Sequence, residues 1–378
     1  MYGALLCVPP MVHIIREEFD ITNAQVGFLV SLPLAVLAVA AIPAGMLSDR
    51  IGVKKATVIG AALMSVGCLL RGGVSDYRLL YLFTGLFGLG FTLVYPNLPK
   101  IAHAWFSREK VGLATGIYTT GISLGGTIPY VIDLPILLPI TNTSQGVFYF
   151  WSAPAVAAFI LCWVVVKETP RTEEPIRIVV QDRDKPLRML RDRNLWFAAL
   201  LMVANSMHFY VWASWTPSLM VLKGATPEFA SAITSIRGWA GLPAMFLVPL
   251  VSYKIGLRKP FLWGSGLLLA FMALWAIYMS SSWGWLLMAL VGLLVSGSFS
   301  MILALPAELS GRRSIGSASG MILSIGFVGG LIGPWLAGYL FDISGTLDWS
   351  LVGLIVIGLA WTLVGALIPE TGGKNRLA

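Results

Sequence analysis

The sequence predicts an all-α, multi-pass membrane protein in which two related halves each contribute six helices. Three observations predict this fold: an apolar composition, a series of apolar runs of helix length, and an internal repeat. Of the 378 residues, 57% are hydrophobic and 12% are charged, whereas a soluble domain is about 25% charged. A chain this apolar needs lipid around it, so the bilayer is its first expected partner.

The apolar runs form two sets of six. The first set covers residues 1–15, 25–47, 56–74, 79–101, 111–134 and 146–166, and the second covers 195–221, 228–251, 260–281, 284–307, 315–340 and 349–368. Residues 167–194, rich in charge and proline, separate an N-terminal bundle (1–166) from a C-terminal bundle (195–378) as a linker. The first run is short for a bilayer, so we expect a truncated first helix whose natural start lies upstream of Met1.

The basic residues predict the orientation. The net charge is +8, and 20 of the 26 Lys and Arg residues lie in alternate loops, in the linker and at the C-terminus. Because cytoplasmic loops are enriched in basic residues, we expect a multi-pass plasma (inner) membrane protein with a cytoplasmic linker and C-terminus. This topology accounts for the positive charge, and nucleic acid is not an expected partner.

An offset of 204 residues aligns the two halves without a gap. It places residues 45–55 on 249–259, residues 111–116 on 315–320, and the pair Gly125-Gly126 on Gly329-Gly330. One offset that serves loops and helices alike indicates duplication of a six-helix unit. Transporters built from two such units rock them around a site near the middle of the membrane.

The segment after the second run reads Gly45-x-Leu47-Ser48-Asp49-Arg50-x-Gly52-x-Lys54-Lys55. It resembles the loop signature of the major facilitator superfamily, and with the twelve runs, the linker and the repeat the resemblance covers nearly the whole chain. The resemblance implies two six-helix bundles, with substrate bound between them and exposed alternately to either side. It also implies that this loop has a gating role, carried by Gly45, Asp49, Arg50, Gly52, Lys54 and Lys55.

The residue types of this loop agree with such a role. Glycines permit a tight turn, and Asp49 can face the partly positive start of another helix. The resemblance implies that this helix is the eleventh span, which begins near Ser314 and Ile315. Tyr253 stands at the position of Asp49 in the second copy, so any latch is one-sided. The alternative is a basic loop that only anchors the topology.

Two further segments bear on the substrate. The stretch from Tyr95 to Phe106, together with Gly112–Gly116, is similar to the connection between spans four and five in the cyanate-permease-like and organic-anion branches, which favours an anion. Thr84 replaces an arginine of many proton-coupled members, which argues against proton coupling by that route. The segment Gly121–Gly126 lacks the Gly-Pro pair of drug exporters, which weakens that alternative.

Arg237 is the leading candidate for substrate binding. It lies about ten residues into the eighth run, where an arginine costs about 2.5–3.5 kcal/mol even on lenient insertion scales. No acid is expected near the centre of any span, because Asp133 and Glu308 are placed near span ends. A water-filled cavity or an anionic substrate is therefore the expected partner of Arg237, with backbone carbonyls as the alternative.

Other polar side chains complete the expected site. In the seventh run, Asn205, His208 and Trp212 share one helical face, and His208 could carry a coupling proton. The alternative is that His208 and Trp212 pack against helices and lipid. From the first half, the expected lining residues are Tyr95, Asn97 and Tyr118.

Together these features predict a monomeric secondary active transporter that moves a small anion or organic acid by alternating access. A drug or cation exporter is the alternative, disfavoured because no carboxylate is central, and a transporter-like sensor without flux is another. An enzyme is not expected, since the sequence has no nucleophile motif, phosphate-binding loop or metal-ligand cluster. We accordingly expect no catalytic residues, no metal and no cofactor.

Overall fold

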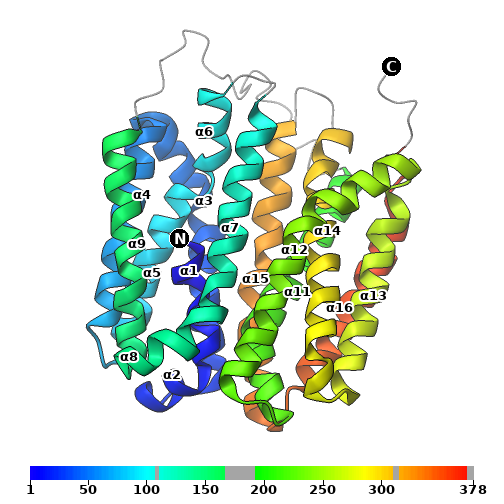
Figure 1. Cartoon of the computed structure of the whole chain (residues 1–378). Helices are drawn as coiled ribbons and strands as arrows, with labels where there is room; N and C mark the ends of the chain where they lie inside the picture. The colour runs from blue at the N-terminus through cyan, green and yellow to red at the C-terminus, as the bar shows by residue number, and fades with distance from the viewer. Residues whose placement is uncertain (107–109, 167–191, 310–314, 373–378) are drawn as a thin grey trace.

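The computed structural model describes residues 1–106, 110–166, 192–309 and 315–372. Within these ranges, eleven helices are long and apolar enough to cross a membrane, and they stand side by side in Figure 1. The all-α, multi-pass fold expected from the sequence is therefore confirmed.

Each expected apolar run corresponds to helical structure. The first half contains α1 (Tyr2–Leu6), η1 (Pro9–Met11), α2 (Val12–Phe19), α3 (Asn23–Ile51), α4 (Val53–Gly72), α5 (Tyr77–Val94), α6 (Asn97–Trp105), α7 (Val111–Ile132), the π-helical turn η2 (Asp133–Leu137), α8 (Leu138–Thr141) and α9 (Ser144–Val165). The second half contains α11 (Arg193–Leu222), α12 (Pro227–Ile255), α13 (Lys259–Tyr278), η3 (Ser281–Trp283), α14 (Gly284–Leu309), α15 (Ile315–Ser344) and α16 (Asp348–Leu367).

Prolines explain why two runs are divided. Pro9 and Pro10 lack a backbone N–H, and the first run breaks there into α1 and α2, neither of which is long enough to be a candidate span. Pro96 divides the fourth run into α5 and α6 in the same way. The second break places the aromatic ring of Tyr95 at a bend.

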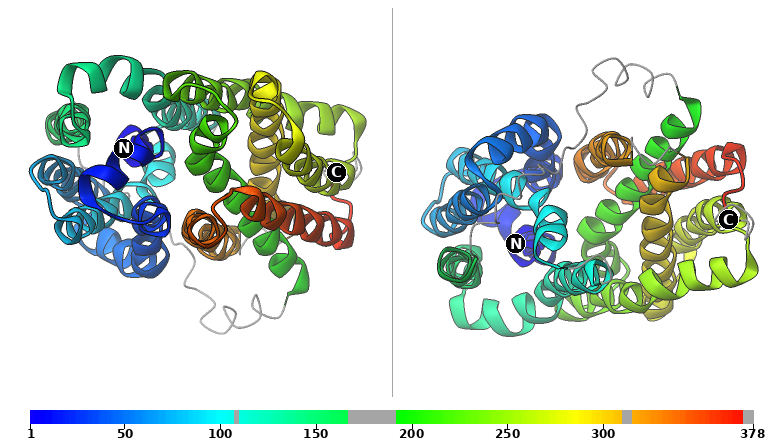
Figure 2. Two further views of the ribbon diagram at one scale, coloured as in Figure 1. Left: turned by 90° about the horizontal axis from the view of Figure 1, so that it is seen from below. Right: turned by 90° about the horizontal axis from the view of Figure 1, so that it is seen from above.

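Helices of the first half lie on one side of the molecule and helices of the second half on the other, as both views of Figure 2 show. The halves meet where α3 packs on α15 and where α7 packs on α12. The bundle boundaries at residues 166 and 195 adjoin a range outside the described residues and stay a prediction.

The duplicated register is visible in three dimensions. Helices α3 and α5 cross where Gly88 faces the backbone of Pro33, and α12 and α14 cross where Gly292 faces the backbone of Arg237. Pro33 and Arg237 are related by the offset of 204, and so are Gly88 and Gly292. Two equivalent crossings with glycine at the same place indicate two copies of one helix arrangement.

The signature segment is more helical than expected. Helix α3 continues to Ile51, so Gly45 lies inside the helix rather than in the turn that the sequence suggested. Gly52 alone makes the turn, with a φ of 96° that favours glycine. Arg50 lies in the last turn of α3, and Lys54 and Lys55 lie in the first turn of α4.

The latch expected between Asp49 and the eleventh span falls outside what the structure describes. The side chains of Asp49 and Ile315, and all of Ser314, lie outside the described residues. The gating role of the signature segment therefore stays a prediction.

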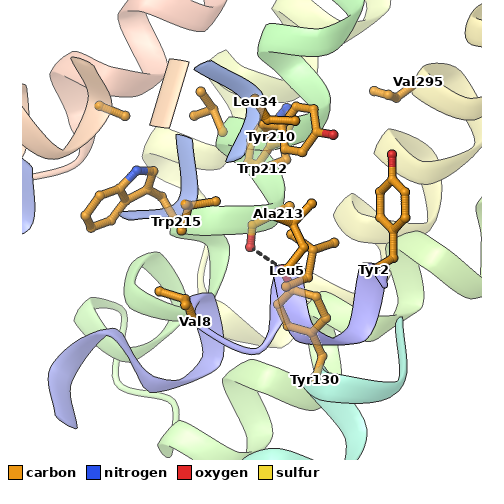
Figure 3. Packing of buried hydrophobic residues seen from close by; sticks show 14 of the residues in the cluster. Tyr2, Leu5, Val8, Leu34, Tyr130, Tyr210, Trp212, Ala213, Trp215 and Val295 are labelled. Carbon is orange, nitrogen blue, oxygen red and sulfur yellow. Dashed lines mark hydrogen bonds between the residues drawn. The ribbon is translucent and has the colours of Figure 1, made fainter. Parts of the chain in front are cut away.

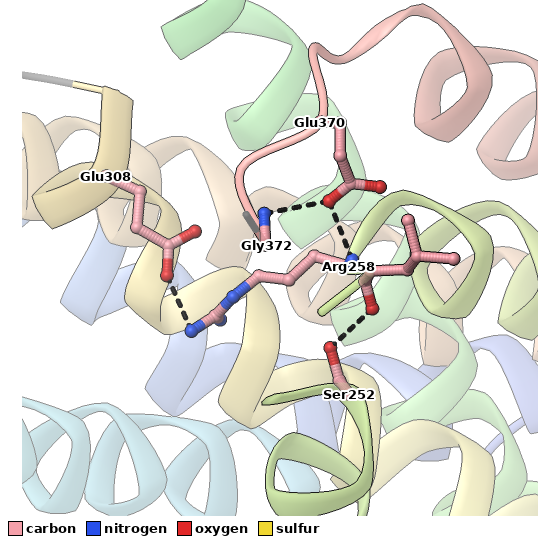
Figure 4. Close-up of polar contacts among 6 residues, drawn as sticks. Ser252, Arg258, Glu308, Glu370 and Gly372 are labelled. Atoms are coloured by element: carbon pink, nitrogen blue, oxygen red, sulfur yellow. Dashed lines mark hydrogen bonds and ion pairs between the residues drawn. The ribbon is translucent and has the colours of Figure 1, made fainter. Parts of the chain in front are cut away.

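The corresponding loop of the second half is held by acids of its own bundle (Figure 4). Arg258 forms an ion pair with Glu308 at 2.7 Å. The Glu370 carboxylate accepts hydrogen bonds from the backbone N–H groups of Arg258, Lys259 and Gly372, at 2.7, 3.1 and 2.8 Å. Glu370 thus caps the start of α13, where the helix leaves N–H groups unpaired.

Candidate functional site

A cavity of about 740 Å³ lies between the two halves. We call the end of the molecule at which α9 ends and α11 begins the linker end. In each long helix the lining residues lie in the middle or toward the linker end, such as Ala41 in α3 and Leu303 in α14. The cavity therefore extends from the middle of the molecule toward the linker end.

At the opposite end, Asp342 of α15 binds the start of α3. Its carboxylate accepts hydrogen bonds from the backbone N–H groups of Asn23 and Ala24, at 2.9 and 2.7 Å. It also accepts one from the side-chain amide of Asn23 at 2.8 Å. A carboxylate suits this position because a helix start carries unpaired N–H groups and a partial positive charge. This contact joins the two halves.

Tyr130 of α7 makes a second polar contact between the halves. Its hydroxyl donates to the carbonyl of Ala213 in α11 at 2.8 Å, as Figure 3 shows. Its own carbonyl accepts a hydrogen bond from the Ser231 hydroxyl of α12, also at 2.8 Å. Together with the Asp342 contact, these bonds hold the halves together beyond the cavity.

Arg237 is buried in α12, with 5% of its surface exposed, and lines the cavity. Its guanidinium carbon lies 4.4 Å from the centroid of the Phe209 ring, and its neighbours include the hydroxyls of Tyr130 and Tyr210. The Nε atom is buried without a hydrogen-bond partner. Within the described ranges, no acidic side chain forms an ion pair with Arg237. An aromatic face and hydroxyls stabilise the cation without neutralising it.

Three more expected residues line the same cavity: Asn205, Tyr95 and Tyr118. The side-chain amide of Asn205 donates to the carbonyl of Val295 at 2.9 Å, which ties α11 to α14. The ring of Tyr95 packs edge-on against Phe327 of α15, with centroids 5.8 Å apart. The structure therefore brings Arg237, Asn205, Tyr95 and Tyr118 together around one space.

His208 and Trp212 do not line this cavity. The His208 ring is fully buried and faces Trp361 of α16, with centroids 6.1 Å apart. The cavity side of α11 is instead formed by Asn205, Ser206, Phe209 and Tyr210. The spacing predicted a shared face correctly, but that face is turned toward α16, and only Asn205 at its edge reaches the cavity.

Asn97 also lies away from the cavity. Its side chain accepts a hydrogen bond from the Ser48 hydroxyl at 2.8 Å and donates to the carbonyl of Leu93 at 2.8 Å. It therefore connects α6 to the last turns of α3. Asn97 therefore stabilises the signature segment through Ser48, because both hydrogen bonds of its amide are made within the first half.

Two buried charged groups differ from their expected loop or end positions. Arg71, near the end of the apolar run 56–74, is 2% exposed, and it donates to the carbonyl of Ala4 at 2.9 Å while its guanidinium lies 4.4 Å from the Phe148 ring. Asp133 is fully buried, and its carboxylate accepts a hydrogen bond from the Trp151 indole at 3.0 Å. A residue near a helix end can still be covered by short helices such as α1, which hydropathy cannot show.

Several lining aromatic residues were missed. They are Tyr2, Phe209, Tyr210, Phe299 and Phe327. The repeat could have identified one of them, because Phe299 occupies the position 204 residues after Tyr95. Within the described residues, no group of three or more His, Cys, Asp or Glu side chains could hold a metal ion.

The comparisons with known proteins decide the family. Residues 1–226 match the model of the Major Facilitator Superfamily. The chain belongs to the Major Facilitator Superfamily. The resemblance that the signature segment indicated is thus confirmed. The chain is an integral membrane protein, and it is a transporter rather than an enzyme.

Named relatives match over most of their length. The cyanate transport protein CynX of Escherichia coli is 23% identical, over 95% of this chain and 92% of that protein. The gentisate transporter of Corynebacterium glutamicum is 23% identical, over 86% of this chain and 75% of that protein. The crystal structure of a D-xylose-proton symporter has the same fold, with a TM-score of 0.83 at 17% identity, over 99% of this chain and 97% of that one.

Proposed function

We propose that this member of the superfamily is a secondary active transporter that moves a small anion or organic acid by alternating access. The observation that carries the proposal is a buried guanidinium in the cavity between the halves, with no acidic side chain among the described residues of the lining. A buried cation without a counter-charge is costly, so an anionic substrate lowers the free energy when it binds. The names of the cyanate and gentisate relatives support an anion.

The geometry suggests how the substrate moves. In this conformation Arg237 is reached from the linker end, because Asp342 and Tyr130 join the halves at the other end. For Arg237 to face the other side, those contacts must separate while the linker ends of the helices approach one another. The signature segment from Gly45 to Lys55 lies at the linker end, where Asp49 would meet the start of α15 in that second state.

The linker end is proposed to face the cytoplasm, because most basic residues lie in its loops. The protein would then sit in the plasma (inner) membrane and bind its substrate from inside in the present conformation. We propose that it acts as a monomer, because residues of both halves of one chain line the cavity and this cavity holds the candidate substrate-binding residue Arg237.

Transport by the purified, reconstituted protein tests the proposal. Liposomes would be assayed for uptake of labelled cyanate, nitrate, formate and gentisate, with Arg237→Gln as the variant and Arg78→Gln, an exposed arginine, as the matched control. We expect uptake of at least one anion, its loss in Arg237→Gln, and no change in Arg78→Gln. Anion uptake that survives in a folded Arg237→Gln protein would remove Arg237 from the site.

A drug or cation exporter is less well supported. Among the described residues that line the cavity there is no carboxylate that could pair with a cation. A sensor without flux would bind the same anion as a transporter. Binding without uptake in the liposome assay would therefore favour the sensor.

A further inference from the structure

The charged side chains of the cavity indicate which charges a substrate can carry. Among the lining residues that the structure describes, Arg237 and Lys100 carry positive charge and none carries negative charge. Lys100 lies in α6 toward the linker end, so Arg237 is the cation that a substrate meets in the middle of the molecule. A single guanidinium in the middle of the molecule can pair with one negatively charged group of the substrate. A zwitterion would leave its ammonium group without a partner, which is costly in a buried site.

Aromatic rings form a second part of the wall. Tyr2, Tyr95 and Phe327 line the cavity, with ring centroids 6.2 Å apart for Tyr2 and Tyr95 and 5.8 Å apart for Tyr95 and Phe327. Phe91 stacks behind Tyr95 at 5.3 Å and 9°, which fixes the Tyr95 ring. Figure 3 shows Tyr2 and Tyr210 among the residues packed between the halves. Such a surface favours the flat apolar face of a ligand.

Three polar side chains of the lining already form hydrogen bonds within the protein. The Thr119 hydroxyl donates to the carbonyl of Thr115 at 2.8 Å, and the Thr127 hydroxyl donates to the carbonyl of Ser123 at 2.7 Å. The amide of Asn205 is used on α14. A substrate with many hydroxyl groups needs a partner for each one that loses water, and each unpaired group costs about 1–3 kcal/mol. These walls suit an apolar body better than a sugar acid.

We propose that the substrate is a monocarboxylic acid with an aromatic or similarly flat apolar body. Its carboxylate binds Arg237, and its body lies against Tyr2, Tyr95 and Phe327. This class rests on the proposed function, since it specifies which anion the same cavity takes. An inorganic anion leaves the aromatic wall uncovered, and a polyhydroxy acid places hydroxyl groups against that apolar wall.

Binding to the purified full-length protein tests the class. Titration calorimetry would compare benzoate, gluconate and nitrate, each of which carries one negative charge. We expect benzoate to bind at least about tenfold more tightly than gluconate or nitrate, because only benzoate covers the aromatic wall. Thermal unfolding of each variant would establish that it is folded.

Two substitutions distinguish the loss of a ring that contacts the ligand from the loss of a ring elsewhere in the protein. Phe327→Leu removes a lining ring, and Phe271→Leu, which changes an exposed ring on α13, is the matched control. We expect Phe327→Leu to weaken benzoate binding about 2- to 10-fold, with nitrate binding unchanged, and Phe271→Leu to change neither.

The outcomes distinguish this inference from the proposed function. If gluconate or nitrate binds as tightly as benzoate and Arg237→Gln abolishes that binding, the aromatic class is wrong and the anion proposal stands. If none of the three anions binds, the aromatic class is wrong, and the liposome assay with cyanate, formate and gentisate decides the proposed function. If benzoate binds equally well to Arg237→Gln, Arg237 is not the anion site, and the aromatic class fails together with the observation that carries the proposed function.

Discussion

Replacing Asp342 by asparagine probes what holds the halves together at the end away from the linker. The start of α3 needs partners for its first N–H groups. Thr22 and Gln25 form a capping box that satisfies the N–H of Gln25 from within the same half. The N–H groups of Asn23 and Ala24 depend instead on Asp342 of the other half. The Asp342→Asn side chain keeps one acceptor oxygen and loses the charge.

The magnitude follows from those bonds. A hydrogen bond to a charged group contributes about 1.5–3 kcal/mol, and a charge at a helix start adds about 0.3–1 kcal/mol. Water replaces part of this when the halves separate, since the Ala24 contact is partly exposed. We expect the closed arrangement at this end to lose about 1.5–3 kcal/mol relative to the open one, a change of about 10- to 150-fold in their ratio.

Cysteine accessibility measures this ratio. Ser31 is fully buried between the halves, and its hydroxyl donates to the carbonyl of Gly330 at 3.4 Å. A thiol reagent reaches Ser31→Cys only when the halves separate, so its labelling rate follows the population of the open state. We expect Asp342→Asn to raise that rate by about the factor calculated above. Labelling of Ser319→Cys, which lines the cavity, should fall as the linker end closes.

A matched control separates this effect from simple loss of a helix cap. Asp76 caps α5 at the same end, through the N–H of Arg78 at 2.8 Å, but lies within one half. Asp76→Asn should leave Ser31→Cys labelling unchanged. Equal labelling in the parent and in Asp342→Asn, or an equal rise in Asp76→Asn, would refute the reasoning.

Three further predictions concern the position of Arg237, the buried carboxylate of Asp133 and the pH dependence of the contribution of Glu370 to stability. Gly292→Ala places a methyl group against the backbone of Arg237, so we expect anion binding to weaken about tenfold or more, whereas Gly264→Ala, which meets open space, should leave it unchanged in the same titration. Asp133→Asn keeps the acceptor for the Trp151 indole, so it should unfold at a higher temperature than Asp133→Ala, by the equivalent of about 1–3 kcal/mol, and equal melting temperatures would contradict this. Partial burial raises the pKa of Glu370, but the N–H groups of Arg258, Gly372 and Lys259 outweigh it and hold the pKa below its ordinary 4.5. The stability that this carboxylate contributes is therefore complete above pH 4.5 and is lost as the pH falls through the lowered pKa. In thermal unfolding at neutral pH, Glu370→Gln should be less stable than the parent by about 1 kcal/mol, and in acid below the lowered pKa the two proteins should be equally stable.

Hydropathy and the repeat were sufficient to predict the helices, because lipid requires long apolar segments and duplication keeps their register. The same signals placed Arg237 in the middle of a span. They could not give the rotation of α11, which depends on how α16 packs against it, so His208 was expected in the cavity and Phe209 was not. They also could not place Arg71 and Asp133, because short helices cover these residues and hydropathy does not report tertiary cover.

The two equivalent helix crossings suggest how one duplicated scaffold serves both movement and binding. At the first crossing Pro33 faces Gly88, and at the second Arg237 faces Gly292. The shared glycine keeps the geometry of both bundles alike, which lets one bundle rock against the other. On the proposed function, the difference between proline and arginine confines the binding charge to one half, so the anion would stay with the second bundle while the first moves across it. A carrier with the charge at both crossings would need a dianion, or would bury a second unpaired cation at a cost of several kcal/mol. An arginine at only one of these two equivalent positions therefore suits the proposed monoanion.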